Sequence, residues 1–175
     1  HLAESRLIEQ WQAGELVVLV RHAERCDQSN NPCLGPPDGI TRVGELASAD
    51  VGKAFSLLGL ERTDLLTSPT TRTVQTAHSM FSREVTQPEW LAACGTTLRD
   101  EVVAHKSARR NLVLVTHSEC MAELEKHKEK TLIVVDAMGQ QSGTICRELL
   151  KAGYNAAKLS GGVSSWKADN LPLVK

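Results

Sequence analysis

Short runs that are apolar on both faces constrain the fold of this chain more than any other feature. The three clearest runs are Leu16–Val20, Leu112–Thr116 and Leu132–Asp136. A strand without a polar face must be covered by helices on both sides, as the central strands of a parallel sheet are. Because helical segments separate the runs, we predict an α/β fold: a single doubly wound, mainly parallel sheet of about five or six strands flanked by helices.

Further elements complete this plan. Leu65–Thr67 and Ala156–Leu159 are two more strand candidates. The expected helices span residues 4–12, 41–57, 70–81, 96–108, 118–128, 142–152 and 163–168. Prolines and turn-forming residues dominate 26–39, which predicts a loop beside the end of the first strand. A chain of 175 residues, 41% of them hydrophobic, is long enough for one continuous core.

The charge and hydropathy patterns exclude two classes of partner. The formal net charge is -1 and there is no long run of like charge, so neither nucleic acid nor an anionic membrane is expected as the main partner. No stretch approaches the roughly 18 apolar residues that span a bilayer. The chain starts with His1 rather than Met and lacks a signal peptide, which is a weak indication that a leader has been removed.

Five cysteines are too few for a disulfide scaffold in a chain of this length, and an odd number leaves at least one unpaired. Cys26 and Cys33 flank the predicted loop. They could form a local bridge in an oxidising compartment or remain free thiols, and the sequence favours neither.

Polar side chains gather where three predicted strands end. Arg21 and His22 follow the first strand, Arg72 follows the second, and His117 follows the strand at 112–116. The carboxyl ends of parallel strands meet at one edge of a sheet, so these groups are expected to converge. Two histidines and two arginines at one edge form a pocket suited to a phosphoryl group, with phosphate or sulfate as simple ligands.

The same residues resemble the signature of the histidine phosphatase (phosphoglycerate mutase-like) superfamily, over about residues 15–121. The motifs are Leu19-Val20-Arg21-His22-Ala23-Glu24, then Ser68-Pro69-Thr70-Thr71-Arg72-Thr73-Val74-Gln75-Thr76-Ala77, and last Leu112-Val113-Leu114-Val115-Thr116-His117. The resemblance implies a histidine acid-type phosphatase, a phosphoric monoester hydrolase, with His22 as the nucleophile. Arg21, Arg72 and His117 would hold the phosphate oxygens, and neither metal nor cofactor is required.

The proton donor for the leaving group is less well defined. Better-known members carry an acidic residue in a region that here reads Trp90-Leu91-Ala92-Ala93-Cys94-Gly95-Thr96, without a carboxylate. Glu24, which follows His22 closely, is the candidate catalytic acid. Asp100 or Glu101, a group of the substrate, or water are the alternatives.

Details of these motifs look like the bacterial lipopolysaccharide core heptose phosphatase branch of the superfamily. They are Arg25-Cys26-Asp27 after the nucleophile motif, the nearby Cys33, the triplet Ala93-Cys94-Gly95, and Cys120 after His117. The resemblance implies a phosphorylated sugar or other phosphorylated small molecule as substrate, and a periplasmic location.

After Met121 the sequence changes character. Residues 122–175 resemble the second half of a rhodanese domain, with Asp136 where a rhodanese has its sulfur-carrying cysteine, so sulfurtransferase activity is not expected. We therefore expect residues 1–175 to form one hybrid α/β domain, with a phosphatase-like part over 1–121. The abrupt change indicates a chimera, of natural or engineered origin.

Two other functions compete with phosphomonoester hydrolysis. One is a folded but inactive chimera that keeps the anion-binding pocket without turnover. The other is a non-catalytic rhodanese-like binding module, which predicts an exposed loop at Met138–Gln141 and no dependence on His22.

Overall fold

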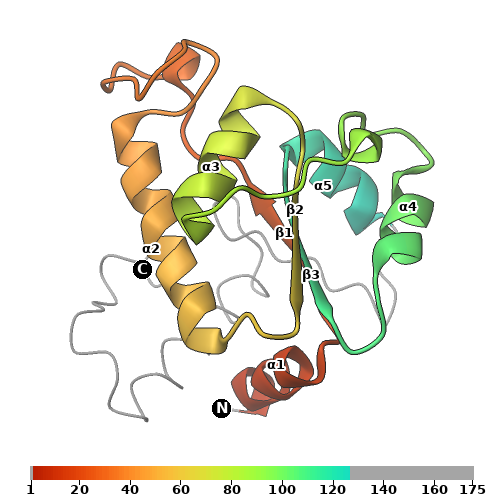
Figure 1. Ribbon diagram of the computed structural model, residues 1–175. Helices are drawn as coiled ribbons and strands as arrows, with labels where there is room; N and C mark the ends of the chain where they lie inside the picture. The colour runs from red at the N-terminus through yellow and green to blue at the C-terminus, as the bar shows by residue number, and fades with distance from the viewer. Residues whose placement is uncertain (1, 127–175) are drawn as a thin grey trace.

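The computed structural model describes residues 2–126. The strands expected at 132–136 and 156–159, the helices at 142–152 and 163–168, and the loop at 138–141 all lie outside the described residues. Within 2–126 the chain forms an α/β fold with a parallel sheet and helices on both faces (Figure 1). This confirms the predicted fold class.

The sheet contains the first three predicted strands. They are β1 (Val17–Arg21), β2 (Thr63–Thr67) and β3 (Asn111–Thr116). Their order is β1-β3-β2, and β3 pairs in parallel with both neighbours. All six residues of β3 are buried, as expected for a strand between two others. The strand predicted at 65–67 begins two residues earlier, because the polar Thr63 and Asp64 pair with β3 at an edge where apolar residues are not required.

Alternate residues of each strand face two separate cores. On one side Val18, Val20, Val113 and Val115 pack against α2 (Arg42–Leu58) and α3 (Thr71–Phe81). On the other side Val17, Leu19, Leu112 and Leu114 pack against the 3-10 helix η2 (Glu89–Leu91), α4 (Leu98–His105) and α5 (Ser118–Glu125). The period-2 alternation of side chains in a strand explains how β1 and β3 contribute to both cores.

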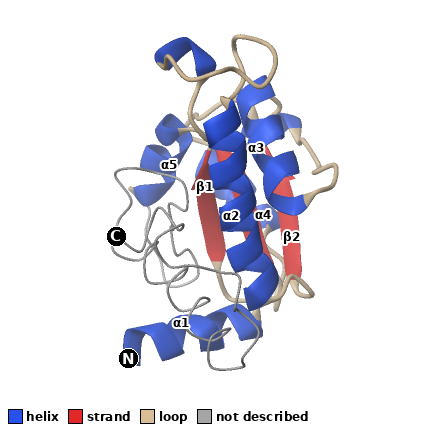
Figure 2. Cartoon of the chain, turned by 90° about the vertical axis from the view of Figure 1, so that its left-hand side faces the viewer, coloured by secondary structure: helices blue, strands red, loops and turns tan. Residues whose placement is uncertain are grey.

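The helix α1 (Leu2–Ala13) lies across the amino ends of the strands, as Figure 2 shows from a second side. Trp11 donates a hydrogen bond to the Gly59 carbonyl at 2.8 Å. The buried Asn111 accepts from the Leu16 backbone N–H at 2.9 Å and donates to the Trp11 carbonyl at 2.8 Å. These bonds satisfy the polar groups that α1 buries when it closes the lower end of the sheet.

Residues 26–39 form the predicted loop, with one difference. Cys26–Gln28 make a short 3-10 helix, η1, and Cys26 and Cys33 are joined by a disulfide rather than free. Backbone contacts hold the two ends of the loop together. The Cys26 N–H donates a hydrogen bond to the Gly39 carbonyl, and Cys33 forms an isolated antiparallel β-bridge with Thr41. Figure 1 shows it extending beyond the carboxyl ends of the strands.

Candidate functional site

His22 begins the site at the end of β1. Its backbone N–H continues the sheet ladder to the Thr116 carbonyl at 3.1 Å, and its side chain is only 9% exposed. The ring Nδ1 lies 2.8 Å from the Ala23 carbonyl oxygen. A carbonyl oxygen only accepts, so Nδ1 carries the proton and a neutral ring has its free lone pair on Nε2.

The neutral form of His22 is strongly favoured. Its pKa is lowered from 6.5 to about 4, first because burial disfavours the cation and then because Arg72, Arg21 and His117 lie nearby. The hydrogen bond to Ala23 acts in the opposite direction and is outweighed. At neutral pH the ring is therefore an uncharged base and nucleophile surrounded by cationic groups.

His117 stands opposite, at the end of β3 and the start of α5. It occupies the N-cap position of that helix, and its ring lies 5.7 Å from the His22 ring at 62°. Burial and then Arg72 lower the pKa of His117, while Glu119 opposes the shift. Its Nδ1 is buried without a hydrogen-bond partner among residues 2–126.

Two arginines complete the cluster. Within the described part of the chain, Arg21 Nε and Arg72 Nε are also buried without a partner, so three of the four such side-chain atoms belong to these site residues. Buried donors are nearly always paired in folded proteins. Arg72 lies in the first turn of α3, and His117 caps α5, so the amino ends of two helices add partial positive charge. This arrangement suits an anion with several acceptor oxygens.

Hydroxyl groups hold the strand ends together below the cluster. Ser68, just after β2, lies 3.1 Å from Thr116 Oγ1 and 3.0 Å from the Leu91 carbonyl. Thr73 in α3 donates to the Ser68 carbonyl at 2.6 Å. The exits of β2 and β3 and the start of α3 are thereby fixed to one another.

Glu24 is placed differently from the other predicted residues. Its carboxylate accepts hydrogen bonds from Asn31 Nδ2 at 2.9 Å and Thr41 Oγ1 at 2.8 Å, and these bonds lower its pKa. Thr41 is the N-cap of α2. The geometry thus gives Glu24 a structural part in the loop, and its lowered pKa disfavours the protonated form that a proton donor needs.

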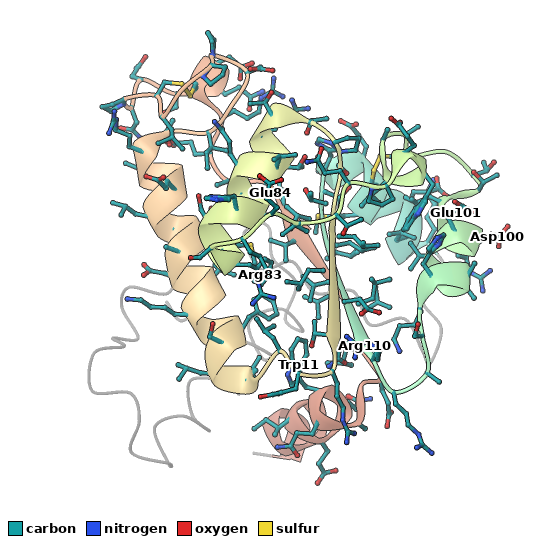
Figure 3. The ribbon with its side chains drawn as sticks, in the orientation of Figure 1. Trp11, Arg83, Glu84, Asp100, Glu101 and Arg110 are labelled. Atoms are coloured by element: carbon teal, nitrogen blue, oxygen red, sulfur yellow. A yellow bond between two sulfur atoms is a disulfide. The ribbon has the colours of Figure 1, made fainter. Side chains whose placement is uncertain are left out.

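The other carboxylates considered as proton donors lie on α4 and α5. Figure 3 shows Asp100 and Glu101 on α4, beside the sheet, and Asp100 pairs with Arg99 at the surface. Glu119, which the sequence did not single out, lies in the first turn of α5 and acts electrostatically on both His117 and Arg25. Its position two residues after His117 is the sequence feature that could have pointed to it.

A second disulfide, which the sequence did not predict, joins Cys94 to Cys120. It links the segment between η2 and α4 to the first turn of α5, three residues after His117. Cys94 and Cys120 are 26 residues apart, so no local sequence pattern indicates that they pair. It lies on the side of the site formed by η2, α4 and α5.

The fold and the site together define an α/β domain with a cluster of arginine and histidine side chains at the carboxyl edge of its sheet. Comparison with known proteins adds particular relatives. The chain is 36% identical over 129 residues to the lipopolysaccharide core heptose(II)-phosphate phosphatase of Shigella flexneri serotype 5b (strain 8401), covering 71% of this chain and 64% of the relative. It is 38% identical over 117 residues to the proteins of that name from Salmonella paratyphi B and Salmonella typhi, covering 65% of this chain.

A second resemblance concerns the later part of the chain. The rhodanese-like domain family matches residues 102–169, a range that begins before the boundary expected at 122. A continuous stretch covering 71% of the chain includes β3 and His117 wherever it starts, so both resemblances share this strand. The chain spans 57 to 64% of the length of the phosphatases that it matches.

No helix within residues 2–126 is long and apolar enough to cross a membrane.

Proposed function

We propose that this protein is a phosphomonoesterase of the histidine phosphatase superfamily that acts through a phosphohistidine intermediate on His22. The observation that carries the proposal is the hydrogen bond from Nδ1 to the Ala23 carbonyl, which leaves the Nε2 lone pair free. The pKa of about 4 keeps this nitrogen unprotonated at neutral pH. A buried neutral imidazole beside unpaired guanidinium donors has the chemistry that nucleophilic attack on a phosphate ester requires.

The reaction has two steps. Nε2 attacks phosphorus in line with the ester oxygen, the P–O bond to that oxygen breaks, and the alcohol leaves with its electron pair and a proton. Water then attacks the phosphorus of the phosphohistidine and gives a proton to the conjugate base of the acid used in the first step, the P–N bond breaks, and Nε2 recovers its lone pair. Inorganic phosphate is the second product.

The cationic groups stabilise charge that develops on the transferred phosphoryl group. Arg21 and Arg72 would each donate to its equatorial oxygens, which is the contact that their unpaired Nε atoms lack. His117 Nδ1 supplies a third donor. Binding a phosphate would also raise the pKa of His117, because the anion favours the imidazolium form.

We propose Glu119 as the donor of the proton that the leaving oxygen needs. Its position two residues after His117, in the first turn of α5, and its electrostatic interaction with His117 and Arg25 support this role. Glu24 stays bonded to Asn31 and Thr41 in this proposal and takes no part in proton transfer.

A phosphorylated sugar is the proposed substrate class, by analogy with the relatives named for heptose(II)-phosphate. We also propose a periplasmic location. The disulfides Cys26–Cys33 and Cys94–Cys120 support it, since disulfides persist in oxidising compartments.

The test measures hydrolysis of 4-nitrophenyl phosphate and of a sugar phosphate by the full chain. We expect turnover, acid-labile labelling of His22, and a loss on the order of a thousandfold in His22→Ala, because the covalent route needs the nucleophile. A folded protein that releases no phosphate, or a His22→Ala variant as active as the parent, would contradict the proposal.

The inactive chimera with an anion-binding pocket is a second candidate. It is favoured by the match of the rhodanese-like family to 102–169, since the later part of the phosphatase fold would then be replaced. It predicts that inorganic phosphate binds and raises the melting temperature, while neither ester is hydrolysed. A rhodanese-like binding module predicts that His22→Ala changes neither phosphate binding nor turnover.

We further propose that both resemblances belong to one hybrid α/β domain over residues 1–175. Their shared use of β3 supports this, because one strand cannot belong to two independently folding domains. A single cooperative unfolding transition by fluorescence and circular dichroism is expected. Two separated transitions would contradict it.

A further inference from the structure

A chain of three hydrogen bonds connects the nucleophile to the helix that carries Arg72. His22 Nδ1–H donates to the Ala23 carbonyl at 2.8 Å, and the Ala23 N–H donates to Thr76 Oγ1 at 3.0 Å. Thr76 Oγ1 in turn donates to the Arg72 carbonyl at 2.7 Å. All three bonds lie within the ordinary range for strong hydrogen bonds.

The Thr76 hydroxyl both accepts and donates a hydrogen bond. The oxygen accepts one bond and its single proton makes the other, while the side chain is 0% exposed on the inner face of α3. A buried hydroxyl must be paired in this way to avoid a desolvation penalty. Packing alone at this position would be served equally well by valine.

The residue that Thr76 holds is the one that orients His22. Ala23 is bound on its N–H by Thr76 and on its carbonyl by the His22 ring. Its Cβ packs closely against α2 at Gly44, where an added methyl group would lie 3.1 Å from it. The direction of the Ala23 carbonyl, and with it the direction of Nε2, therefore depends on the anchor in α3.

We propose that Thr76 is a positioning residue that fixes the tautomer and orientation of His22 relative to Arg72. This inference rests on the proposed phosphatase function of the same site. Thr76 touches neither phosphate nor the reacting atoms. It acts by setting the angle at which Nε2 meets the phosphorus that the arginines hold.

The expected consequence is a loss of turnover that exceeds the loss of binding. Thr76→Val keeps the shape of the side chain but leaves the Ala23 N–H unpaired, so His22 loses its fixed orientation. Arg72 stays in place, because its carbonyl is still bonded within the helix. Small displacements of a reacting group commonly cost up to about a hundredfold in rate.

Three variants test the proposal. We expect Thr76→Val to lower kcat by about ten- to a hundredfold, with less than about a threefold change in the affinity for inorganic phosphate. Thr76→Ser keeps the hydroxyl and should restore most of kcat. Thr63→Val is the matched control, because Thr63 is a buried threonine at the amino end of β2 whose hydroxyl has no partner in the described part of the chain. It should leave kcat unchanged.

Nitrogen NMR of the His22 ring provides a readout independent of turnover. The parent should show one tautomer with the proton on Nδ1, and Thr76→Val should show a mixture. An unchanged kcat with unchanged ring signals would overturn the proposal, as would a parallel fall in kcat and phosphate affinity, or a Thr76→Ser variant as slow as Thr76→Val.

The two proposals fail in different ways. If the folded parent hydrolyses no ester, the phosphatase function is wrong, and the ring signals of Thr76→Val still decide whether Thr76 positions His22. Circular dichroism melting establishes that each variant is folded. Should Thr76→Val melt below the assay temperature, Thr76→Ala takes its place with the same expected results.

Discussion

The rings of His22 and His117 lie edge to face, with centroids 5.7 Å apart and planes inclined at 62°. Each is buried, and a charge on His117 is one of the causes that lower the pKa of His22. The His117 ring therefore helps to disfavour protonation of the His22 ring. At neutral pH the fixed positive charge of the site therefore comes from its arginines, because the lowered pKa of each histidine favours the neutral ring.

The first prediction concerns the titration of these rings. By NMR, the His22 ring should take its proton near pH 4 and the His117 ring below 6.5 in the free protein. Saturating inorganic phosphate should raise the apparent pKa of His117, because the bound anion stabilises the cation. A free His22 that titrates near 6.5 would contradict the geometry on which the nucleophile is assigned.

The same shift predicts how stability depends on pH. The unfolded chain binds a proton at His22 near pH 6.5, whereas the native chain binds it only near pH 4, so between these values the unfolded state holds more protons. The free energy of unfolding should therefore fall as the pH is lowered through this window. Urea midpoints at pH 7 and pH 5 should move further apart in the parent than in His22→Asn. Equal differences would show that His22 does not carry the effect.

How far the sequence predicts this molecule depends on whether the signal is local. The runs at 16–20 and 112–116 predict β1 and β3, because a short apolar run indicates a buried strand even when its partner strands are not known. The polar residues at the strand ends could be placed at one edge because parallel topology alone requires it. Both predictions use short-range patterns and one general rule of sheet architecture.

What the sequence could not provide depends on contacts between distant segments. The bond of Ala23 to Thr76 and the disulfide of Cys94 with Cys120 join residues that only the tertiary fold brings together. Glu24 was a reasonable acid from its nearness to His22 in sequence, but its hydrogen bonds to Asn31 and Thr41 depend on the path of the 26–39 loop. Side-chain direction at a loop is decided by such partners.

Arg72 should control phosphate affinity. Removing one charged hydrogen-bond donor typically costs about 1.5–3 kcal/mol, so Arg72→Met should weaken inorganic phosphate binding by about ten- to a hundredfold. Arg83, an exposed arginine just beyond the carboxyl end of α3 (Figure 3), gives the control Arg83→Met. Calorimetric titration measures both. A similar affinity in the two variants would remove Arg72 from the site.

Replacing Glu24 distinguishes a structural carboxylate from a catalytic acid. Glu24→Gln replaces the carboxylate that accepts hydrogen bonds from Asn31 and Thr41 with a neutral amide. It should lower the free energy of unfolding by up to about 1 kcal/mol. Hydrolysis of a sugar phosphate, whose alkoxide needs a proton, should fall no more than hydrolysis of the aryl ester. Glu119→Gln should affect the sugar phosphate more strongly. The reverse pattern would return the acid role to Glu24.

Removal of the Cys94–Cys120 disulfide should destabilise the protein more than removal of Cys26–Cys33. The cross-links close loops with sequence separations of 26 and 7 residues. Loop-closure entropy then predicts costs of about 3.5 and 2.5 kcal/mol for the paired alanine variants. Urea denaturation under oxidising conditions measures both.

Because Cys120 follows His117 in the first turn of α5, the Cys94→Ala/Cys120→Ala variant should also bind phosphate less tightly, whereas the other pair should not. Equal stability losses with unchanged phosphate affinity would mean that this disulfide supports neither α5 nor the pocket.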